Sequence, residues 1–267
     1  MCLTAGTGKP RVVKGLLPDS VRRRFDPGGR YGLRITLFAF ALVLVAVPFG
    51  VLLQQVVSEG PLLRVDHGVA NSVHEWVVRR GPGFVDAVRL VSWLGRPPFL
   101  SLVAVLVCAF LLRRGRTRLA IFVVTTAIMG GLVDTAVKNL VHRPRPVFDH
   151  PVATAIGKSF PSGHSMSSAI VYGSLLLVLL PAIPRRRRPW AIGGTVLLVL
   201  TIAASRIALG VHFLSDVVGG LVLGVAWLAA SVAAFRIWRT ERGRKPTPVA
   251  AGLEPEAARD LKVGAGT

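Results

Sequence analysis

The sequence predicts an all-α polytopic membrane protein with six transmembrane helices, and two observations support this fold class. Of the 267 residues, 52% are hydrophobic, and they gather in long blocks rather than at periodic positions. A helical block of about 20 apolar residues is long enough to cross roughly 30 Å of hydrocarbon. The chain also carries a net charge of +20, and its basic residues lie between the blocks, as in the loops of membrane proteins.

The same composition argues against a nucleic-acid-binding protein and against an ordinary soluble domain. A nucleic-acid-binding face would interleave basic residues with aromatic ones, so no nucleic-acid partner is expected. The two cysteines are Cys2, in a basic segment, and Cys108, inside an apolar block. They are not placed to meet, so we expect neither a disulfide nor a metal site with thiolate ligands.

Six apolar segments follow one another along the chain. Residues 1–34 form a basic tail, and residues 35–237 form the expected six-span membrane domain. The spans are expected at 35–56, 98–112, 119–140, 163–182, 189–209 and 213–235. The first run is longer than the core of a typical signal peptide, so we expect it to be retained. Residues 238–267 are polar and proline-containing, which predicts a disordered tail.

The segment 57–97 is too polar to cross a membrane. Its apolar residues recur at helical spacing, at Val65, Val69, Val73, Trp76 and Val77. This pattern predicts an amphipathic helix at the outer membrane interface, with the tryptophans at the level of the lipid headgroups.

The basic residues also predict the orientation of the chain. Lys and Arg concentrate in the two tails and in the loops after the second and fourth spans. With six spans, all four segments fall on one side, which the positive-inside rule assigns to the cytoplasm. We therefore expect a multi-pass plasma-membrane protein with both termini cytoplasmic. The connections 57–97, 141–162 and 210–212 then face outward, and three polar motifs lie on or beside them.

The first motif, Phe160-Pro161-Ser162-Gly163-His164, opens an apolar run. Ser162 is a good N-cap residue, and a helix start offers free N–H groups and a positive dipole end to a phosphate. Gly163 would let an anion approach the backbone closely. Taken alone, the motif is also typical of a capped helix with a histidine at the membrane surface.

The second motif contains Arg206, His212 and Asp216. His212 and Asp216 are four residues apart and share a helix face, where the carboxylate would orient the imidazole and leave one ring nitrogen free to attack. Gly210 interrupts the helix, so Arg206 ends the fifth span and His212 begins the sixth. The alternative is an Asp–His pair that only satisfies itself. Ionisable groups at membrane depth cost about 2.5–3.5 kcal/mol each, which favours a function.

The third motif contributes Lys138 and Arg145, followed by a proline that helps to end the helix. Arg145 is therefore expected in a loop at the mouth of the site. An arginine offers a planar fork for phosphate oxygens, and a lysine offers a point charge. The alternative, basic residues that anchor a helix end, fits Arg143 better than Lys138. Asp134 lies four residues before Lys138, and we expect it to pair with Lys138 and to orient it.

These motifs resemble the three signature motifs of the type-2 phosphatidic acid phosphatase superfamily, which also includes glucose-6-phosphatase and the vanadium haloperoxidases. They read Lys138-x6-Arg145-Pro146, Pro161-Ser162-Gly163-His164 and Ser205-Arg206-x5-His212-x3-Asp216. All three match in order and at full spacing. The motifs cover residues 138–216, and the six-span layout extends the resemblance to about residues 35–235.

The resemblance implies catalytic roles for three residues. His212 would be the nucleophile that forms a phosphohistidine, Asp216 would orient it, and His164 would protonate the leaving group and then activate water. His212 must therefore start neutral and His164 protonated. We expect the surrounding cations to lower the pKa of both histidines, and Asp216 to counteract this for His212.

The resemblance also implies how the phosphoryl group is held. The expected phosphate-binding residues are Lys138, Arg145, Ser162, Gly163 and Arg206, with Asp134 behind Lys138. The superfamily works without a metal, and the sequence has no Asp-rich or Cys/His ligand cluster, so no cofactor is expected.

The predicted function is a metal-independent membrane phosphatase that hydrolyses a lipid phosphate or lipid diphosphate at the outer leaflet. Candidate substrates are undecaprenyl diphosphate, phosphatidic acid and phosphatidylglycerol phosphate, and family analogy alone slightly favours the prenyl diphosphate. One alternative is a lipid phosphotransferase with the same phosphohistidine. Another is a non-catalytic lipid-phosphate binder or transporter, but binding needs only cations, so the two histidines favour an enzyme.

Overall fold

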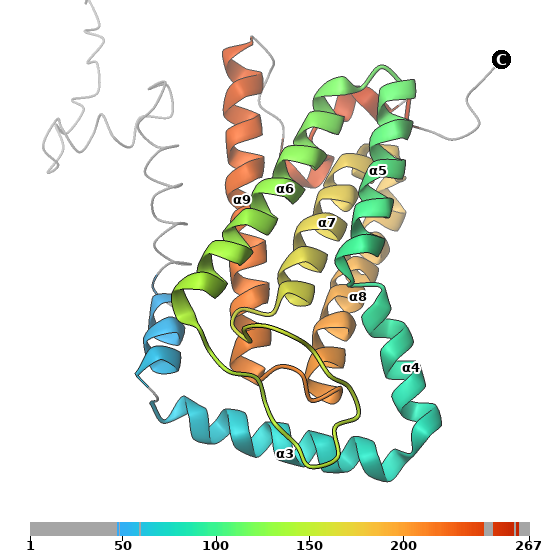
Figure 1. Ribbon diagram of the computed structural model, residues 1–267. Helices are drawn as coiled ribbons and strands as arrows, with labels where there is room; N and C mark the ends of the chain where they lie inside the picture. The colour runs from blue at the N-terminus through green and yellow to red at the C-terminus, as the bar shows by residue number, and fades with distance from the viewer. Residues whose placement is uncertain (1–46, 48, 59, 243–247, 259, 262–267) are drawn as a thin grey trace, which may run out of the picture. The chain divides into compact units, whose positions relative to one another are not determined.

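The computed structural model describes residues 47, 49–58, 60–242, 248–258 and 260–261, and within them every regular element is helical (Figure 1). The chain divides into two units, Met1–Leu44 and Val45–Thr267, and all described residues belong to the second. The longer helices are α3 (Leu62–Arg80), α4 (Pro82–Trp93), α5 (Pro97–Arg113), α6 (Thr117–Val141), α7 (Gly163–Leu179), α8 (Arg188–Ala208) and α9 (Leu214–Glu241). Short 3-10 turns are η1 (Leu180–Ala182), η2 (Arg185–Arg187), η3 (Val249–Ala251) and η4 (Pro255–Ala258).

Helix α7 forms the centre of the bundle, where it contacts α5, α6, α8 and α9 (Figure 1). In the most apolar stretch of the span that contains α7, 61% is buried inside the protein, whereas the corresponding stretches of α6, α8 and α9 are 28–33% buried. The outer helices therefore leave most of their apolar surface free for lipid. Such all-round apolarity is what a membrane-spanning helix requires.

Four of the described helices are long and apolar enough to cross a membrane: α6, α7 with η1, α8 with η2, and α9. Helices α4 and α5 would make a fifth span together, because as a pair they are also long and apolar enough, with a bend of 43° between them. The all-helical membrane fold is therefore confirmed for the described residues. The first expected span, 35–56, lies mostly outside them, so six spans and their orientation remain predictions.

Glycines in α9 allow it to lie directly against the start of α7. A Cβ atom on Gly220 would come within 2.5 Å of the Ser162 carbonyl oxygen, and one on Gly224 within 2.8 Å of the Met166 carbonyl oxygen. No side chain fits at either position, because real Cβ contacts are longer. This close approach brings the N-terminal ends of α7 and α9 together.

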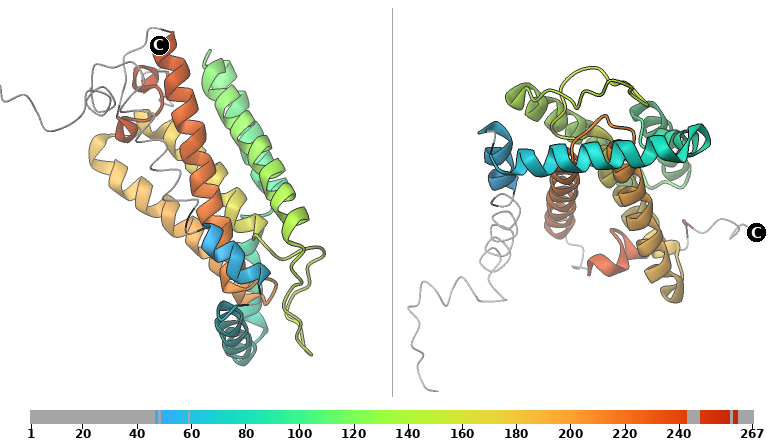
Figure 2. Two further views of the ribbon diagram at one scale, coloured as in Figure 1. Left: turned by 90° about the vertical axis from the view of Figure 1, so that its left-hand side faces the viewer. Right: turned by 90° about the horizontal axis from the view of Figure 1, so that it is seen from below.

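Helix α3 lies across the end of the bundle at which the 142–162 loop and the α8–α9 connection also lie (Figures 1 and 2). Its buried residues are Asp66, Ala70, His74 and Val77. Of the expected apolar stripe, Val77 is buried and Val73 packs beside it, whereas Val65 is 50% exposed and Trp76 42% exposed, so only part of the stripe faces the bundle. The polar segment 57–97 contains two helices, α3 and α4, rather than one, and Gly81 separates them at φ +84°.

The C-terminal segment packs against the other end of the bundle (Figure 1). Leu253, Ala257 and Leu261 are buried in the main apolar core, and Arg239 of α9 pairs with Glu256 at 2.6 Å. Arg116 pairs with Asp260. A disordered tail was expected over 238–267, whereas the described residues 248–258 and 260–261 are ordered. The reason is an apolar residue every fourth position, which lets this short segment bury one face.

Candidate active site

The three motifs converge at the α3 end of the bundle, although they come from five parts of the chain. Lys138 lies in the last turn of α6 and Arg145 in the following loop. The start of α7 contributes Ser162, Gly163 and His164, the last turn of α8 contributes Arg206, and the α8–α9 connection with the first turn of α9 contributes His212 and Asp216.

His212 lies beside Asp216, as their spacing predicts. Helix α8 ends at Ala208, Gly210 turns the chain at φ +68°, and α9 begins at Leu214, so His212 precedes the helix rather than beginning it. Its Nδ1 atom lies 3.4 Å from Asp216 Oδ2. The Ser159 hydroxyl donates to the same carboxylate oxygen, and so does the Phe213 backbone N–H, at 2.9 Å. The Asp216 carboxylate is therefore held beside the imidazole from several sides.

Arg145 faces the other nitrogen of the same imidazole. Its Nη1 atom lies 3.0 Å from His212 Nε2 and donates to the Val211 carbonyl at 2.7 Å, while its Nε donates to the Gly157 carbonyl at 3.0 Å. Because a guanidinium only donates, we assign the unprotonated nitrogen to Nε2 and the N–H to Nδ1, which faces Asp216. In this tautomer the lone pair of Nε2 points to the cation that would hold a phosphoryl group.

The imidazole of His212 is kept neutral by its surroundings. Burial lowers the pKa of His212 from 6.5 to about 4. The hydrogen bond and the charge of Asp216 oppose this shift of the pKa, and the charges of Arg145 and Arg206 reinforce it. Cations were expected to lower the pKa of His212 and Asp216 to raise it, and both directions agree; burial makes the largest contribution to the shift. His212 is thus uncharged at neutral pH.

The start of α7 lies against the Asp134–Lys138 pair. Lys138 Nζ contacts both carboxylate oxygens of Asp134, at 2.5 and 2.6 Å, as the sequence predicts. A Cβ atom on Gly163 would lie 3.2 Å from Lys138 Nζ and 3.1 Å from Asp134 Oδ2. Ser162 occupies the N-cap position, but its side chain makes no capping hydrogen bond and instead accepts one from the Ser165 hydroxyl at 3.0 Å.

Arg206 and His164 each have one buried polar atom that makes no hydrogen bond to the described residues. Arg206 donates from Nη1 to the Ser92 hydroxyl of α4 at 2.6 Å, but its buried Nε is unpaired. The Nε2 atom of His164 is buried and unpaired as well. Buried polar atoms are normally satisfied, so both are suited to contact a ligand. A Cβ atom on Gly95 would lie 3.2 Å from His164 Cδ2, so the α4–α5 junction closes over this histidine.

Arg143 is the main site residue that the sequence reasoning missed. It was expected to anchor a helix end, yet it is only 7% exposed and lies in the site. Its Nη1 atom pairs with Asp216 Oδ1 at 2.6 Å, and its Nη2 atom pairs with Asp66 Oδ2 of α3 at 2.7 Å. The available signal was Asp66 itself, which shares a helix face with Ala70, His74 and Val77 in a chain with only 13 acidic residues.

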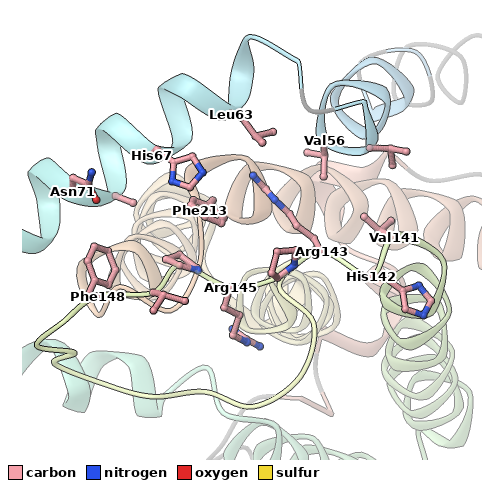
Figure 3. Close-up of a pocket in the computed structure, with 15 residues that line it drawn as sticks. Val56, Leu63, His67, Asn71, Val141, His142, Arg143, Arg145, Phe148 and Phe213 are labelled. Atoms are coloured by element: carbon pink, nitrogen blue, oxygen red, sulfur yellow. The ribbon is translucent and has the colours of Figure 1, made fainter.

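A cavity of about 550 Å³ lies between α3, the segment 49–57 and the loop that carries both arginines (Figure 3). Arg143 and Arg145 both line it, and their side chains leave the loop in different directions. His67 and Asn71 of α3 add polar groups to the opposite wall. The cavity therefore borders the site on the side of α3.

The fold and the site define a class of protein. A neutral buried imidazole, fixed by a carboxylate and faced by cations, is suited to attack a phosphoryl group, because phosphoryl transfer needs positioning and stabilisation of negative charge. The fold places this site at one end of an apolar helical bundle. The molecule is thus a membrane protein with the site of a phosphoryl-transfer enzyme.

Comparisons with known proteins identify the family. The model of the PAP2 superfamily matches residues 117–240. Phosphatidylglycerophosphatase B of Bacillus subtilis is 27% identical over 195 residues, which cover 72% of this chain and 89% of that protein. Decaprenylphosphoryl-5-phosphoribose phosphatase of Mycobacterium tuberculosis is 34% identical over 151 residues, which cover 54% of this chain and 76% of that protein. The chain belongs to the PAP2 superfamily and is a membrane lipid phosphatase of that family.

A solved structure shows the same fold. The crystal structure of a transmembrane PAP2-type phosphatidylglycerolphosphate phosphatase from Bacillus subtilis superposes with a TM-score of 0.67 at 22% sequence identity. The match covers 78% of this chain and all of that chain. The resemblance that the motifs suggested is therefore confirmed at the level of family and fold.

Proposed function

We propose that this protein hydrolyses the phosphate monoester or diphosphate bond of a membrane lipid through a phosphohistidine on His212. One observation carries the proposal: the two nitrogens of a single buried imidazole face Asp216 and Arg145, at 3.4 and 3.0 Å. This arrangement supports Nε2 as the attacking atom, because Nδ1 carries the proton that the carboxylate accepts.

The reaction has two steps. In the first, His212 Nε2 attacks phosphorus, the bond from phosphorus to the leaving oxygen breaks, and His164 gives that oxygen a proton. In the second, His164 takes a proton from water, the water oxygen attacks phosphorus, and the bond to His212 breaks to release phosphate. Asp216 stabilises the His212 imidazole while it carries the phosphoryl group.

Five groups would hold the phosphoryl oxygens in both steps. They are the side chains of Lys138, Arg145, Ser162 and Arg206 and the backbone N–H of Gly163. Three of these carry positive charge, and the start of α7 adds the helix dipole, so they would stabilise the negative charge of the transition state. Their support comes from proximity: Gly163 lies beside Lys138, and Arg145 and Arg206 both act on His212.

The proposed topology has six spans, with both termini in the cytoplasm and the site on the outer face. Residues 1–34 form the N-terminal tail, residues 35–237 the membrane domain and residues 57–97 the outer interfacial segment. Support comes from two arginine-rich connections, which lie at the end of the bundle opposite α3 (Figure 1). The α5–α6 connection contains Arg114 and Arg116, and the segment before α8 contains Arg185 to Arg187. Basic loops favour the cytoplasmic side.

The substrate is proposed to be a lipid whose chain stays in the bilayer while its phosphate enters the site. Phosphatidylglycerol phosphate, phosphatidic acid and undecaprenyl diphosphate are the candidates. The names of the relatives support both a glycerophospholipid and a polyprenyl lipid with a terminal phosphate. Transfer of the phosphoryl group to a second lipid or a sugar would use the same first step, and the product distinguishes the two reactions.

The test is phosphate release by the purified full-length protein from these three lipids in detergent, with EDTA present. We expect hydrolysis of at least one lipid, inhibition by vanadate, and turnover reduced to background in His212→Ala. Phosphate that appears on an added acceptor lipid, rather than free, would indicate a phosphotransferase. Substantial phosphate release by His212→Ala would refute the nucleophile assignment.

A further inference from the structure

We propose that Asp66 and Arg143 are positioning residues, which hold the Asp216 carboxylate and the first turn of α9 in place so that His212 can attack. This inference rests on the proposed function, since it assigns a task within the same reaction. Neither residue is a specified position of the three motifs: Arg143 is one of the six unspecified residues between Lys138 and Arg145, and Asp66 lies in the segment expected at the membrane interface.

The geometry fixes both oxygens of the Asp216 carboxylate. Oδ1 accepts from Arg143 Nη1 at 2.6 Å, while Oδ2 accepts from the Ser159 hydroxyl and the Phe213 N–H and faces His212. A carboxylate held on both oxygens cannot rotate away from the imidazole. Arg143 also lies over the Phe213 ring, with its guanidinium carbon 4.4 Å from the ring centroid, so its own position is fixed.

Asp66 caps α9 from another helix. Its Oδ1 accepts from the Ser215 backbone N–H at 2.9 Å, and its Oδ2 accepts from the Ser215 hydroxyl and from Arg143 Nη2 at 2.7 Å. Ser215 lies in the first turn of α9, whose N–H groups have no partner within the helix. A carboxylate at this end also complements the helix dipole. Asp66 therefore fixes the turn that carries Asp216.

Complete burial makes this cluster sensitive to the loss of one member. Asp66 and Asp216 are 0% exposed, and Arg143 is 7% exposed. Two carboxylates share one guanidinium, so removal of either partner leaves a buried charge without full compensation. Buried charges that were only structural could be replaced by apolar groups, whereas here one of the carboxylates contacts the nucleophile. The cluster thus acts on His212 through Asp216.

The charged and titratable groups around His212 come from five elements. They are Asp216 of α9, Arg145 of the loop, Arg206 of α8 and, through Asp216, the pair of Arg143 with Asp66 of α3. His164 of α7 interacts electrostatically with His212 as well. Removing the positive charge of Arg143 should raise the pKa of His212, and removing the negative charge of Asp66 should lower it.

The test compares Asp66→Asn and Arg143→Gln in the full-length protein, using the lipid of the panel that the wild type hydrolyses fastest. We expect kcat to fall about tenfold to a hundredfold in each variant, as for other outer-shell partners of a reacting group, with KM within about threefold. The acid limb of kcat/KM should move up in pH for Arg143→Gln and down for Asp66→Asn, by about half a unit to one unit. A merely structural role would not move the two limbs in opposite directions.

Two further variants complete the design. Arg143→Lys keeps the charge but not the fork, so it should restore the position of the acid limb and only part of kcat. Glu75→Gln is the matched control, because Glu75 lies on the same helix with its side chain 67% exposed, and its kinetics should equal those of the wild type. If Arg143→Gln does not fold, the nearly isosteric Asp66→Asn decides the question, because the acid limb of its kcat/KM profile should move to lower pH.

The outcomes separate this inference from the proposed function. Wild-type kcat in Asp66→Asn, or acid limbs that stay in place while only the melting temperature falls, would overturn the positioning role. If His212→Ala is inactive in the same assay, the proposed function survives that result. If His212→Ala retains turnover, the proposed function itself has failed.

Discussion

The pair of Asp134 and Lys138 allows a prediction that can be worked out from the structure. Lys138 Nζ lies 2.5 and 2.6 Å from the two oxygens of Asp134, and the side chains are 22% and 16% exposed for Lys138 and Asp134. The pair touches the start of α7 at Gly163. The perturbation is Asp134→Asn, which keeps the shape of the side chain but removes the charge that holds the lysine.

Two effects of this substitution oppose each other. An unrestrained lysine regains rotamer entropy, and fixing it again on phosphate costs about 1.5–2 kcal/mol. A lysine without its counterion attracts phosphate more strongly, but at a partly exposed site this gain is about 1 kcal/mol or less. The asparagine oxygen still accepts one hydrogen bond. The net loss of phosphate affinity is therefore about 0.5–1.5 kcal/mol, or a factor of about two to ten.

The assay is competitive inhibition by inorganic phosphate, together with KM and kcat for the lipid substrate. In Asp134→Asn we expect the inhibition constant and KM to rise by the same factor, while turnover persists because His212 and His164 are untouched. Asp86→Asn serves as the control, since its carboxylate is 69% exposed and pairs with Arg89 on the surface of α4. Unchanged kinetics, or tighter phosphate binding, would show that Asp134 does not orient Lys138.

Four further predictions follow from the structure. The neutral form of His212 is the proposed nucleophile, and burial lowers the pKa of His212 to about 4. The value of kcat/KM, corrected for substrate ionisation, should therefore persist below pH 6 and fall near pH 4, and a fall centred at pH 6.5 would contradict this. The unfolded chain binds this proton more readily, so stability in detergent should also decrease as the pH falls from 6.5 toward 4. Gly163→Ala should raise KM without lowering the melting temperature, because its Cβ would crowd Lys138, and an unaltered KM would argue against that contact. Leu253→Ala should lower the free energy of unfolding by about 2–3 kcal/mol and leave kcat/KM unchanged; equal stability would mean that the C-terminal segment does not pack on the core.

The effects of Gly163→Ala and Leu253→Ala should be independent, because the two residues lie near opposite ends of α7. Gly163 begins this helix, whereas the Leu253 backbone N–H bonds to the Leu177 carbonyl near its other end, at 3.3 Å. A helix of 17 residues is about 25 Å long. Changes at the two ends should therefore act independently, one on the site and the other on the stability of the bundle.

The sequence could predict those parts of the site that depend on local spacing. Asp134 and Lys138 are four residues apart on one helix, so their contact follows from helix geometry alone. The break at Gly210 is local as well, because a glycine can adopt a positive φ without strain. The capping role expected of the Ser162 side chain was wrong, since the neighbouring Ser165 hydroxyl uses that oxygen instead.

The parts that could not be predicted depend on distant segments. Periodicity suggested an apolar face for α3 and Val77 is buried there, but Asp66 is buried on the same helix as well. The partners of Asp66 are Arg143 and Ser215, which lie 77 and 149 positions further along the chain. A buried carboxylate is stable only when such partners arrive. The ordered C-terminal segment has the same origin, since Leu253 has a core to enter only after α7 and α9 have packed.

The sequence by itself determined the class of the protein: apolar blocks require helices in a membrane, and three motifs at full spacing carry the chemistry of a PAP2 phosphatase. Only the tertiary structure decided how the His212 imidazole is held. The 142–162 loop brings Arg143 and Ser159 to Asp216, and helix α3 brings Asp66 to Arg143. No spacing in the sequence records those contacts. The physical reason is that local geometry sets which residues share a helix, whereas the packing of separate helices sets which buried charges meet.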